Sequence, residues 1–191
     1  MAIFEPIVVQ DKNGSLYTLR SAHPKDGKDV LNFTKTMLQE ADYLITKPTE
    51  YLVPLRREKR MIKQFMYARG RLFLLLFHET RLVGMLDLMN SSRKRLSHVA
   101  DIGMSIDSAY QNLGLGRLLL QHARAWAEAH PTIEKLALEV FKQNEQAIHL
   151  YTSLGFVQEG EKKQAVKLED GTYDSLIQMG RSVLKGGRLD E

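Results

Sequence analysis

The sequence has no cysteine, and this absence removes several kinds of chemistry at once. Without thiols the chain can form no disulfide, no cysteine-ligated zinc or iron–sulfur centre and no acyl-cysteine intermediate. We therefore expect a reducing compartment, the cytoplasm. Long apolar runs are missing as well: the longest, residues 72–77, is far below the roughly 20 residues of a transmembrane helix. The opening residues have no basic stretch leading into a long apolar one, so we expect neither a leader nor a membrane partner.

A strong excess of one charge is also lacking. Lysine and arginine number 27 against 23 aspartate and glutamate, which gives a formal net charge of +4. This balance suits an anionic small ligand such as a phosphate ester, but it lacks the dense basic stripe of a dedicated nucleic-acid-binding protein. The basic stretches at residues 56–60 and 93–95 contain no aromatic residue, so we interpret them as a solvated helix face and a hairpin loop. We expect no nucleic-acid partner.

The length and hydrophobic content predict one folded unit. The chain has 191 residues, of which 43% are hydrophobic, and this is enough to bury one core. No repeat, low-complexity tract or evident linker interrupts the sequence. We therefore predict a single domain over residues 1–191.

The apolar residues follow helical periodicity in some segments and strand-like alternation in others. Helices are predicted at residues 26–40, 54–70, 116–130 and 144–154. Strands are predicted within residues 7–20, 71–77, 82–90, 97–106, 135–141 and 156–180. Asn13-Gly14 and the turn at residues 169–171 divide the first and last of these into hairpins, because such residues tolerate positive φ. Residues 41–53 have no regular pattern.

One short stretch, "QNLGLGR" at residues 111–117, places two glycines where a predicted helix begins. The first N–H groups of a helix have no intrahelical partner, and the glycines leave them unobstructed, so this turn suits a phosphate or pyrophosphate. Arg117 adds a cation. A dinucleotide fingerprint would need a third glycine where Leu119 stands, and no P-loop motif is present. The alternative is a tight strand-to-helix turn with no ligand.

A second stretch, residues 138–156, contains the pattern N-x-x-A-I-x-L-Y-x-x-x-G-F. Asn144 is a natural helix N-cap, and the helical spacing directs Tyr151 toward the sheet while His149 faces outward. The alternative for Tyr151 is a core aromatic residue whose hydroxyl donates to a carbonyl.

Taken together, the two motifs closely resemble the signature motifs of the GNAT superfamily of acetyl-CoA-dependent N-acetyltransferases. The resemblance extends over the whole order of predicted elements. It implies an α+β (mixed α/β) fold with a central, largely antiparallel twisted sheet of about seven strands flanked by about four helices. The closing residues further resemble the branch that contains ribosomal-protein N-terminal acetyltransferases and spermidine acetyltransferases.

The resemblance also implies which residues bind acetyl-CoA. Backbone groups of the strand before the glycine turn would hold the pantetheine arm, and the amides of the turn would hold the pyrophosphate. The implied residues are Met104, Ser105 and Ile106 on the strand, and Gln111, Asn112, Leu113, Gly114, Leu115, Gly116 and Arg117 in the turn. Asn144 would touch the coenzyme, Tyr151 would protonate the departing thiolate, and Glu139 occupies the place of a general base.

Acetyl transfer needs a neutral amine, so some group must accept the amine's proton. Glu139 lies between apolar neighbours, and burial would raise its pKa toward the working range. It can equally be a surface carboxylate or one that pairs with lysine or arginine. Asp101, His98 and Asp87 are reserve bases. The pKa of a tyrosine, about 10, lies close to that of a thiol, about 8.5, so proton transfer from Tyr151 would be nearly balanced.

We predict an N-acetyltransferase that moves an acetyl group to a primary amine by direct attack in a ternary complex, without a metal. The alternative is a domain that binds acetyl-CoA as a sensor or scaffold without catalysis. The acceptor would be bound by the first two helices, residues 41–53 and the closing hairpin. A protein N-terminus, a polyamine and another small amine all remain open, and the resemblance allows a homodimer.

Overall fold

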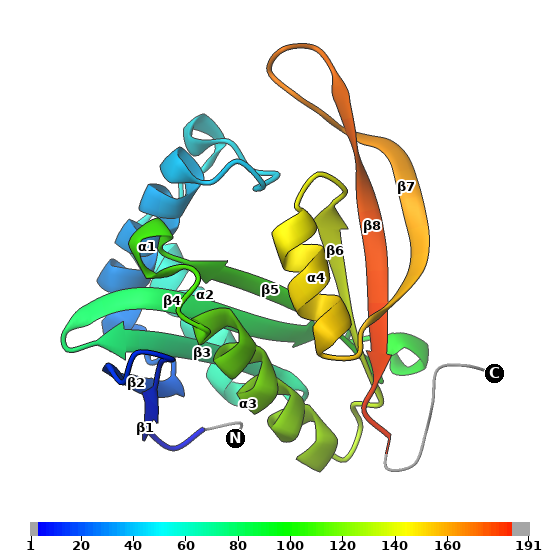
Figure 1. Cartoon of the computed structure of the whole chain (residues 1–191). Coiled ribbons are helices and arrows are strands. Elements are labelled where there is room, and N and C mark those ends of the chain that lie inside the picture. The colour runs from blue at the N-terminus through cyan, green and yellow to red at the C-terminus, as the bar shows by residue number, and fades with distance from the viewer. Residues whose placement is uncertain (1–3, 185–191) are drawn as a thin grey trace.

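The computed structural model describes residues 4–184, and across these residues eight strands form one sheet in the order β1-β2-β3-β4-β5-β6-β8-β7 (Figure 1). The strands are β1 (Ile7–Gln10), β2 (Leu16–Ser21), β3 (Arg71–His78), β4 (Arg81–Asn90), β5 (Val99–Ile106), β6 (Lys135–Phe141), β7 (Val157–Lys167) and β8 (Tyr173–Ser182). Every neighbouring pair is antiparallel except β5 and β6. The predicted α+β class is confirmed. The described sheet has eight strands, as the sequence pattern predicts once both hairpins are counted, and one more than the about seven that the family resemblance implies.

Four α-helices within residues 4–184 cover the two faces of the sheet, in agreement with the number expected (Figure 1). They are α1 (Gly27–Glu40), α2 (Leu55–Tyr67), α3 (Leu115–Ala129) and α4 (Glu145–Ser153). One core joins α3 and α4 to inward residues of the sheet such as Leu86, Leu88 and Leu136. A second core lies under α1 and α2 and contains Phe73 and Leu75 of β3. Alternate side chains of β3 therefore pack into the two different cores, and all six residues 72–77 are buried.

Two adjacent strands separate in the middle of the sheet. Parallel pairing between β5 and β6 is limited to three positions, and the last of them joins Asp101 to Ala137. Beyond that point β5 continues to Ile106 beside β4 alone, whereas β6 continues to Phe141 beside β8. The two strands therefore diverge from Asp101 onward, and the backbone edge of β5 on that side is left without a strand neighbour.

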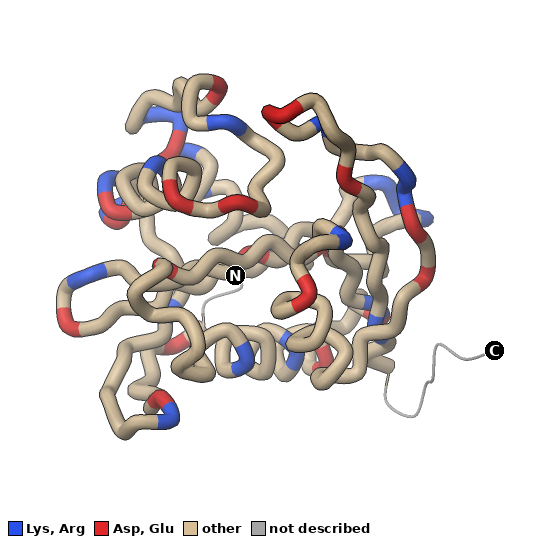
Figure 2. The backbone as a smooth tube through the Cα atoms, turned by 45° about the horizontal axis from the view of Figure 1, so that its top comes forward, with Lys and Arg blue, Asp and Glu red and all other residues tan. Residues whose placement is uncertain are grey.

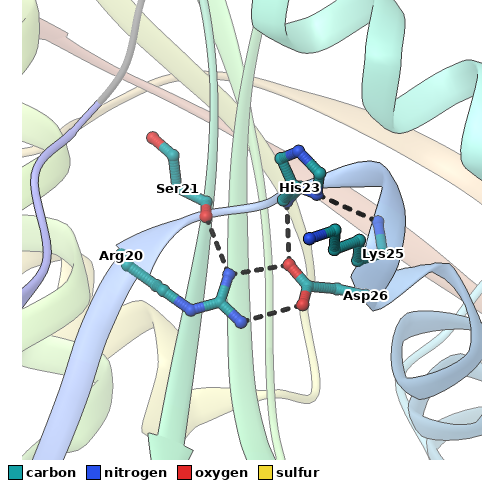
Figure 3. A network of polar contacts seen from close by, with 5 residues as sticks. All are labelled: Arg20, Ser21, His23, Lys25 and Asp26. Atoms are coloured by element: carbon teal, nitrogen blue, oxygen red, sulfur yellow. Dashed lines mark hydrogen bonds and ion pairs between the residues drawn. The ribbon is translucent and has the colours of Figure 1, made fainter.

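The connection from β2 to α1 is held by a polar network around Asp26, which is buried (Figure 3). The Arg20 guanidinium donates to both carboxylate oxygens of Asp26, at 2.7 and 2.8 Å, and the backbone N–H of His23 donates to Oδ2 at 2.8 Å. Burial alone would raise the pKa of Asp26, but these hydrogen bonds outweigh it and lower the pKa. The network holds the connection between the end of β2 and the start of α1 in place.

The segment between α1 and α2 reaches toward the β7–β8 hairpin, which forms one edge of the sheet (Figure 2). It is mostly irregular, as expected, with one 3₁₀ turn at Pro48–Glu50. The Tyr43 hydroxyl donates to the carbonyl of Gln143 at 3.3 Å, and Lys47 lies 3.5 Å from Glu169 at the tip of the β7–β8 hairpin. These contacts place residues 41–53 beside the face of β5 and β6 that carries no helix.

Candidate active site

A cavity of about 360 Å³ lies where β5, the start of α3 and one side of α4 meet. It brings together most of the residues that the two motifs predict. Those of the predicted set that line it are Met104, Ile106, Gln111, Asn112, Gly114, Leu115, Gly116, Arg117, Asn144 and Tyr151. Ser105, Leu113 and Glu139 do not line the cavity. The two motifs, some thirty residues apart in sequence, therefore form one site.

The N-terminus of α3 presents free amides to this cavity. Gly114 is the N-cap residue, with a left-handed φ of +84°, and no side chain caps the helix. Among the described residues, none accepts a hydrogen bond from the amides of residues 112–117. The amide of Gln111 is different, because it donates to the carbonyl of Ser108 at 3.3 Å. The amides of residues 112–117 are therefore the ones without an acceptor among the described residues, and unpaired amides at a helix start suit an anion.

The two glycines serve different purposes. A Cβ on Gly114 would meet no atom within 4 Å, so this glycine is needed for its positive φ. A Cβ on Gly116 would lie 3.3 Å from Leu150 and 3.5 Å from Met104, so this glycine allows α3, α4 and β5 to approach one another closely. The second role could not be read from the spacing of the glycines.

Polar side chains connect the glycine turn to α4. Arg117 donates to the Ser153 hydroxyl at 2.7 Å, and Gln146 donates to Asn112 Oδ1 at 2.7 Å. Asn144 caps α4 as predicted, since its Oδ1 accepts from the Ala147 amide at 3.1 Å. Asn144 itself also lines the cavity.

Tyr151 is buried, with 8% of its surface exposed, and it lines the cavity. Its ring packs edge-on against Phe156, with the centroids 5.8 Å apart. No described residue forms a hydrogen bond with its hydroxyl, so the alternative of a core tyrosine bonded to a carbonyl is not what the structure shows. Burial raises the pKa of Tyr151 to about 12, so the phenol stays protonated at neutral pH and is a weaker acid than the sequence led us to expect.

Glu139 is more exposed than the sequence predicted. Its side chain is 35% exposed, and its Oε1 forms an ion pair with Lys162 and accepts a hydrogen bond from Gln178 at 3.2 Å. The expected burial is wrong, and the lysine-paired alternative is correct. The apolar neighbours Leu138 and Val140 point to the opposite face of the strand, into the core under α3.

The reserve carboxylates lie on the same side of the sheet as Glu139. Asp87 alternates along β4 with Leu86 and Leu88, which face the α3 side, so Asp87 points toward the α1 and α2 side. Burial raises the pKa of Asp87 to about 6. Asp101 is exposed, and partial burial of its carboxylate, followed by the charge of Glu139, raises its pKa.

His98, the remaining reserve base, lies just before β5. Its backbone carbonyl accepts from the amides of Glu134 and Lys135, so the residue helps to align β5 with β6. It does not line the cavity.

Several lining residues were missed by the sequence reasoning. They are Tyr110, Gln146, Ala147, His149 and Leu150. Tyr110 sits in a 3₁₀ turn, Ser108–Tyr110, and its hydroxyl is 3.3 Å from His78 Nδ1. Ala147 follows from Asn144 and Tyr151 once the helix is known, because it lies three residues after the first and four before the second and so shares their side of the helix.

Comparison with known proteins identifies the family. The sequence model described as the acetyltransferase (GNAT) family matches residues 38–156, more than half of the chain and both motifs. The chain belongs to the GNAT acetyltransferase family. The resemblance predicted from the motifs is thereby confirmed.

Curated relatives of this GNAT protein are N-acetyltransferases from Escherichia coli. The L-amino acid N-acetyltransferase AaaT is 33% identical over 99 residues, 52% of this chain and 60% of the relative. The ribosomal protein bS18-alanine N-acetyltransferase is 38% identical over 74 residues, 39% of this chain and 49% of the relative. The match thus spans only about half to three fifths of the length of these relatives.

Solved structures give the same fold over a larger share of the chain. A GNAT acetyltransferase from Streptococcus pneumoniae superposes with a TM-score of 0.84 at 29% identity, over 87% of this chain and 99% of that one. Spermidine N-acetyltransferase from Vibrio cholerae, solved with CoA and spermine, has a TM-score of 0.71 at 20% identity, over 87% and 95% of the two chains. The second likeness concerns the fold alone.

Residues 4–184 contain neither a membrane-spanning helix nor a cluster of metal-ligating side chains. No helix there is long and apolar enough to cross a membrane. No group of three or more histidine, aspartate or glutamate side chains in that range is arranged to hold a metal ion.

Proposed function

We propose that this GNAT protein is an acetyl-CoA-dependent N-acetyltransferase that moves an acetyl group to a primary amine by direct attack in a ternary complex. One observation carries the proposal: the free amides at the start of α3 and the unbonded hydroxyl of Tyr151 line the same cavity. The first group suits a diphosphate and the second suits a departing thiolate. Family membership supports the same chemistry.

In this proposal the cavity holds the coenzyme along its length. The pyrophosphate lies at the amides of residues 112–117, where the positive end of the α3 dipole and Arg117 favour an anion. The pantetheine arm runs along Met104, Ser105 and Ile106, where β6 has already diverged and left the edge of β5 unpaired. Asn144 contributes a side-chain N–H. The thioester then lies in the gap between β5 and β6, accessible from both faces of the sheet.

The reaction follows from this placement. The amine loses a proton to a carboxylate on the face opposite α3, where Glu139 holds the position that the family resemblance implies. The nitrogen lone pair attacks the thioester carbonyl, and a backbone N–H of β5 near Ile106 stabilises the oxyanion. The C–S bond then breaks, the thiolate takes the proton of Tyr151, and the nitrogen loses its second proton through water, which reprotonates the tyrosine. A pKa of about 12 for Tyr151 makes this transfer less balanced than in water, but burial raises the pKa of the thiol as well.

A sensor or scaffold that binds acetyl-CoA without catalysis is the competing function. Such a domain needs the anion site at α3 but no proton donor at the sulfur. The unbonded hydroxyl of Tyr151 at the cavity favours the enzyme, because a merely structural tyrosine satisfies its hydroxyl within the protein.

The names of the relatives give several classes of acceptor amine to test and do not identify a single one. L-amino acids, an alanine of ribosomal protein bS18, and spermidine are the acceptors in the names of proteins similar to this one. We place the acceptor on the face of β5 and β6 that residues 41–53 and the β7–β8 hairpin border. The mixed charges around this face, shown in Figure 2, do not single out one class.

The test is an acceptor screen with acetyl-CoA that follows the release of free thiol. The panel comprises L-amino acids, spermidine and a short peptide beginning with alanine, each compared with acetyl-CoA and protein alone. We expect turnover with at least one member and acetylated product by mass spectrometry. Tight binding of acetyl-CoA without turnover of any member would favour the sensor, and the absence of binding would remove both functions.

A further inference from the structure

Three carboxylates lie on the face of the sheet opposite α3, around the gap between β5 and β6. Asp87 of β4 is paired across the strands with Gly103 of β5, and Asp101 is paired with Ala137 of β6. Glu139 follows Ala137 by two residues and therefore points to the same side. Each of three neighbouring strands thus contributes one carboxylate to the region where the acceptor amine would arrive.

Among the three, Asp87 is held over the neighbouring strand. Its Oδ1 lies 2.7 Å from the point that a Cβ on Gly103 would occupy, and its Cγ lies 3.4 Å from that point. The carboxylate therefore fills the place of the missing side chain on β5. Any residue with a Cβ at position 103 would displace it.

The position of Gly103 shows where the Asp87 carboxylate lies relative to the gap between β5 and β6. Asp101 is the last residue of β5 that pairs with β6, and Gly103 is the next residue on the same face. The Asp87 carboxylate consequently lies over β5 at the first point where β6 has moved away. An amine that reaches a thioester in the gap from this face passes directly beside it.

The other two carboxylates are less suited to take a proton there. Glu139 is already neutralised by Lys162, which contacts the same oxygen that accepts from Gln178. Asp101 is exposed to solvent. Asp87 is half-buried and forms no ion pair with any described residue.

We propose that Asp87, rather than Glu139, is the group that first accepts the proton of the acceptor amine. This inference rests on the proposed function and adds to it the residue that carries the first step. The ammonium group of the acceptor gives one N–H proton to a carboxylate oxygen of Asp87, which becomes a neutral carboxylic acid. The freed lone pair forms the new C–N bond and the carbonyl becomes an oxyanion. When the carbonyl re-forms, the C–S bond breaks and the thiolate takes the Tyr151 proton. The nitrogen loses its second N–H proton through water to the Tyr151 phenolate, and the Asp87 carboxylic acid releases its proton to solvent, which restores both groups. Gly103 is a positioning residue, because it lets the carboxylate reach over β5.

The electrostatics of the site support this role. Burial, as the sole cause, raises the pKa of Asp87 to about 6, so the group is mostly ionised at neutral pH and yet more basic than an ordinary carboxylate. The charged groups on this side of the sheet include Arg20 on β2, Arg71 on β3, Asp101 on β5, Glu139 on β6 with its partner Lys162 on β7, and Glu58 on α2. None of them contributes to the shift.

The experiment compares pH profiles of kcat/KM for the wild type, Asp87→Asn, Asp101→Asn and Glu139→Gln, with the panel member that the wild type turns over fastest. For the wild type we expect kcat/KM to rise with a midpoint near pH 6. Asp87→Asn should lose about 100-fold or more at pH 7 and lose this midpoint, because its rate then follows only the neutral amine in solution. Asp101→Asn and Glu139→Gln should keep the midpoint near pH 6. Acetyl-CoA affinity should be the same in all four proteins.

Two results would overturn the inference. In the first, Asp87→Asn keeps the midpoint near pH 6 and a kcat/KM within about threefold of the wild type. In the second, the midpoint disappears in Glu139→Gln or Asp101→Asn instead. A wild type that binds acetyl-CoA but acetylates no member of the panel would remove the proposed function together with the inference. Loss of activity in Asp87→Asn with weakened acetyl-CoA binding or a lowered melting temperature would indicate a structural role, and this also counts against it.

Discussion

Asp87 on β4 and Gly103 on β5 form a cross-strand pair in which the carboxylate of one occupies the side-chain space of the other. This relationship allows a test that keeps the carboxylate and changes only its place. Gly103 has no left-handed φ, so its backbone accepts alanine without strain, and the new methyl group must push the Asp87 carboxylate aside. Gly103→Ala should lower kcat by about tenfold or more with little change in acetyl-CoA affinity. A fully active Gly103→Ala enzyme would mean that the position of this carboxylate is irrelevant.

The burial of Asp87 predicts a pH-dependent effect on stability. Because the pKa is raised to about 6 in the folded state, the folded protein binds a proton between about pH 4 and 6 that the unfolded chain has released. The ionised group therefore destabilises the fold above pH 6. Asp87→Asn should have a free energy of unfolding close to that of the wild type at pH 4 and higher by up to ~3 kcal/mol at pH 7. Urea unfolding at both pH values measures this, and a variant that is less stable at pH 7 contradicts it.

Tyr151→Phe isolates the proton donor. The ring keeps its contact with Phe156 and its place in the core, so the fold and the cavity should be preserved. We expect kcat to fall by roughly 10²-fold or more, in line with the loss of a general acid, while the Kd of acetyl-CoA changes less than about threefold. An unchanged turnover number would remove Tyr151 from the reaction.

Gly114 and Gly171 form a matched pair for testing the anion site. Their φ angles are +84° and +85°, and a Cβ on either would meet nothing within 4 Å. Alanine at either position should cost ~1 kcal/mol of stability through backbone strain alone. Only Gly114→Ala should weaken acetyl-CoA binding, because Gly171 lies in the β7–β8 turn, away from the cavity. Equal affinities in the two variants would argue against a ligand at the start of α3.

The Arg20–Asp26 network should matter for stability and not for the chemistry (Figure 3). Arg20→Met leaves the buried Asp26 carboxylate without its two side-chain donors, so the free energy of unfolding at pH 7 should fall by ~2–3 kcal/mol. The lowered pKa of Asp26 means that its stabilising effect is present at neutral pH and is lost as the pH falls through that pKa. The difference in free energy of unfolding between the wild type and Arg20→Met should therefore become smaller as the pH falls toward 3. A deficit that does not depend on pH would indicate lost packing instead.

Periodicity predicted the order and type of the elements because the hydrophobic residues dictate them locally. The helix expected at residues 116–130 is observed at Leu115–Ala129, and Gly155 has the left-handed φ of +82° that its place after α4 suggested. The joint cavity was also predictable, although only through the resemblance of the two motifs to a known family. Neither motif alone indicates that its residues lie close to those of the other motif.

The burial of charged residues could not be predicted in the same way. Alternation along β6 shows that Glu139 points away from Leu138 and Val140, but not what covers the face it points to. Glu58 stands within a basic stretch that reads as a solvated helix face, yet it is only 1% exposed. Its Oε2 accepts from the Tyr51 hydroxyl at 3.0 Å, and burial raises its pKa. Such environments depend on segments distant in the chain.

The central claim, that the start of α3 holds the diphosphate of acetyl-CoA, is tested most directly by calorimetric titration of the wild-type protein with acetyl-CoA at several salt concentrations. We expect one binding site per chain and an affinity that falls as salt rises, because the anion is held largely by charge and dipoles. Absence of measurable heat at millimolar acetyl-CoA, together with an unchanged melting temperature, would contradict the account.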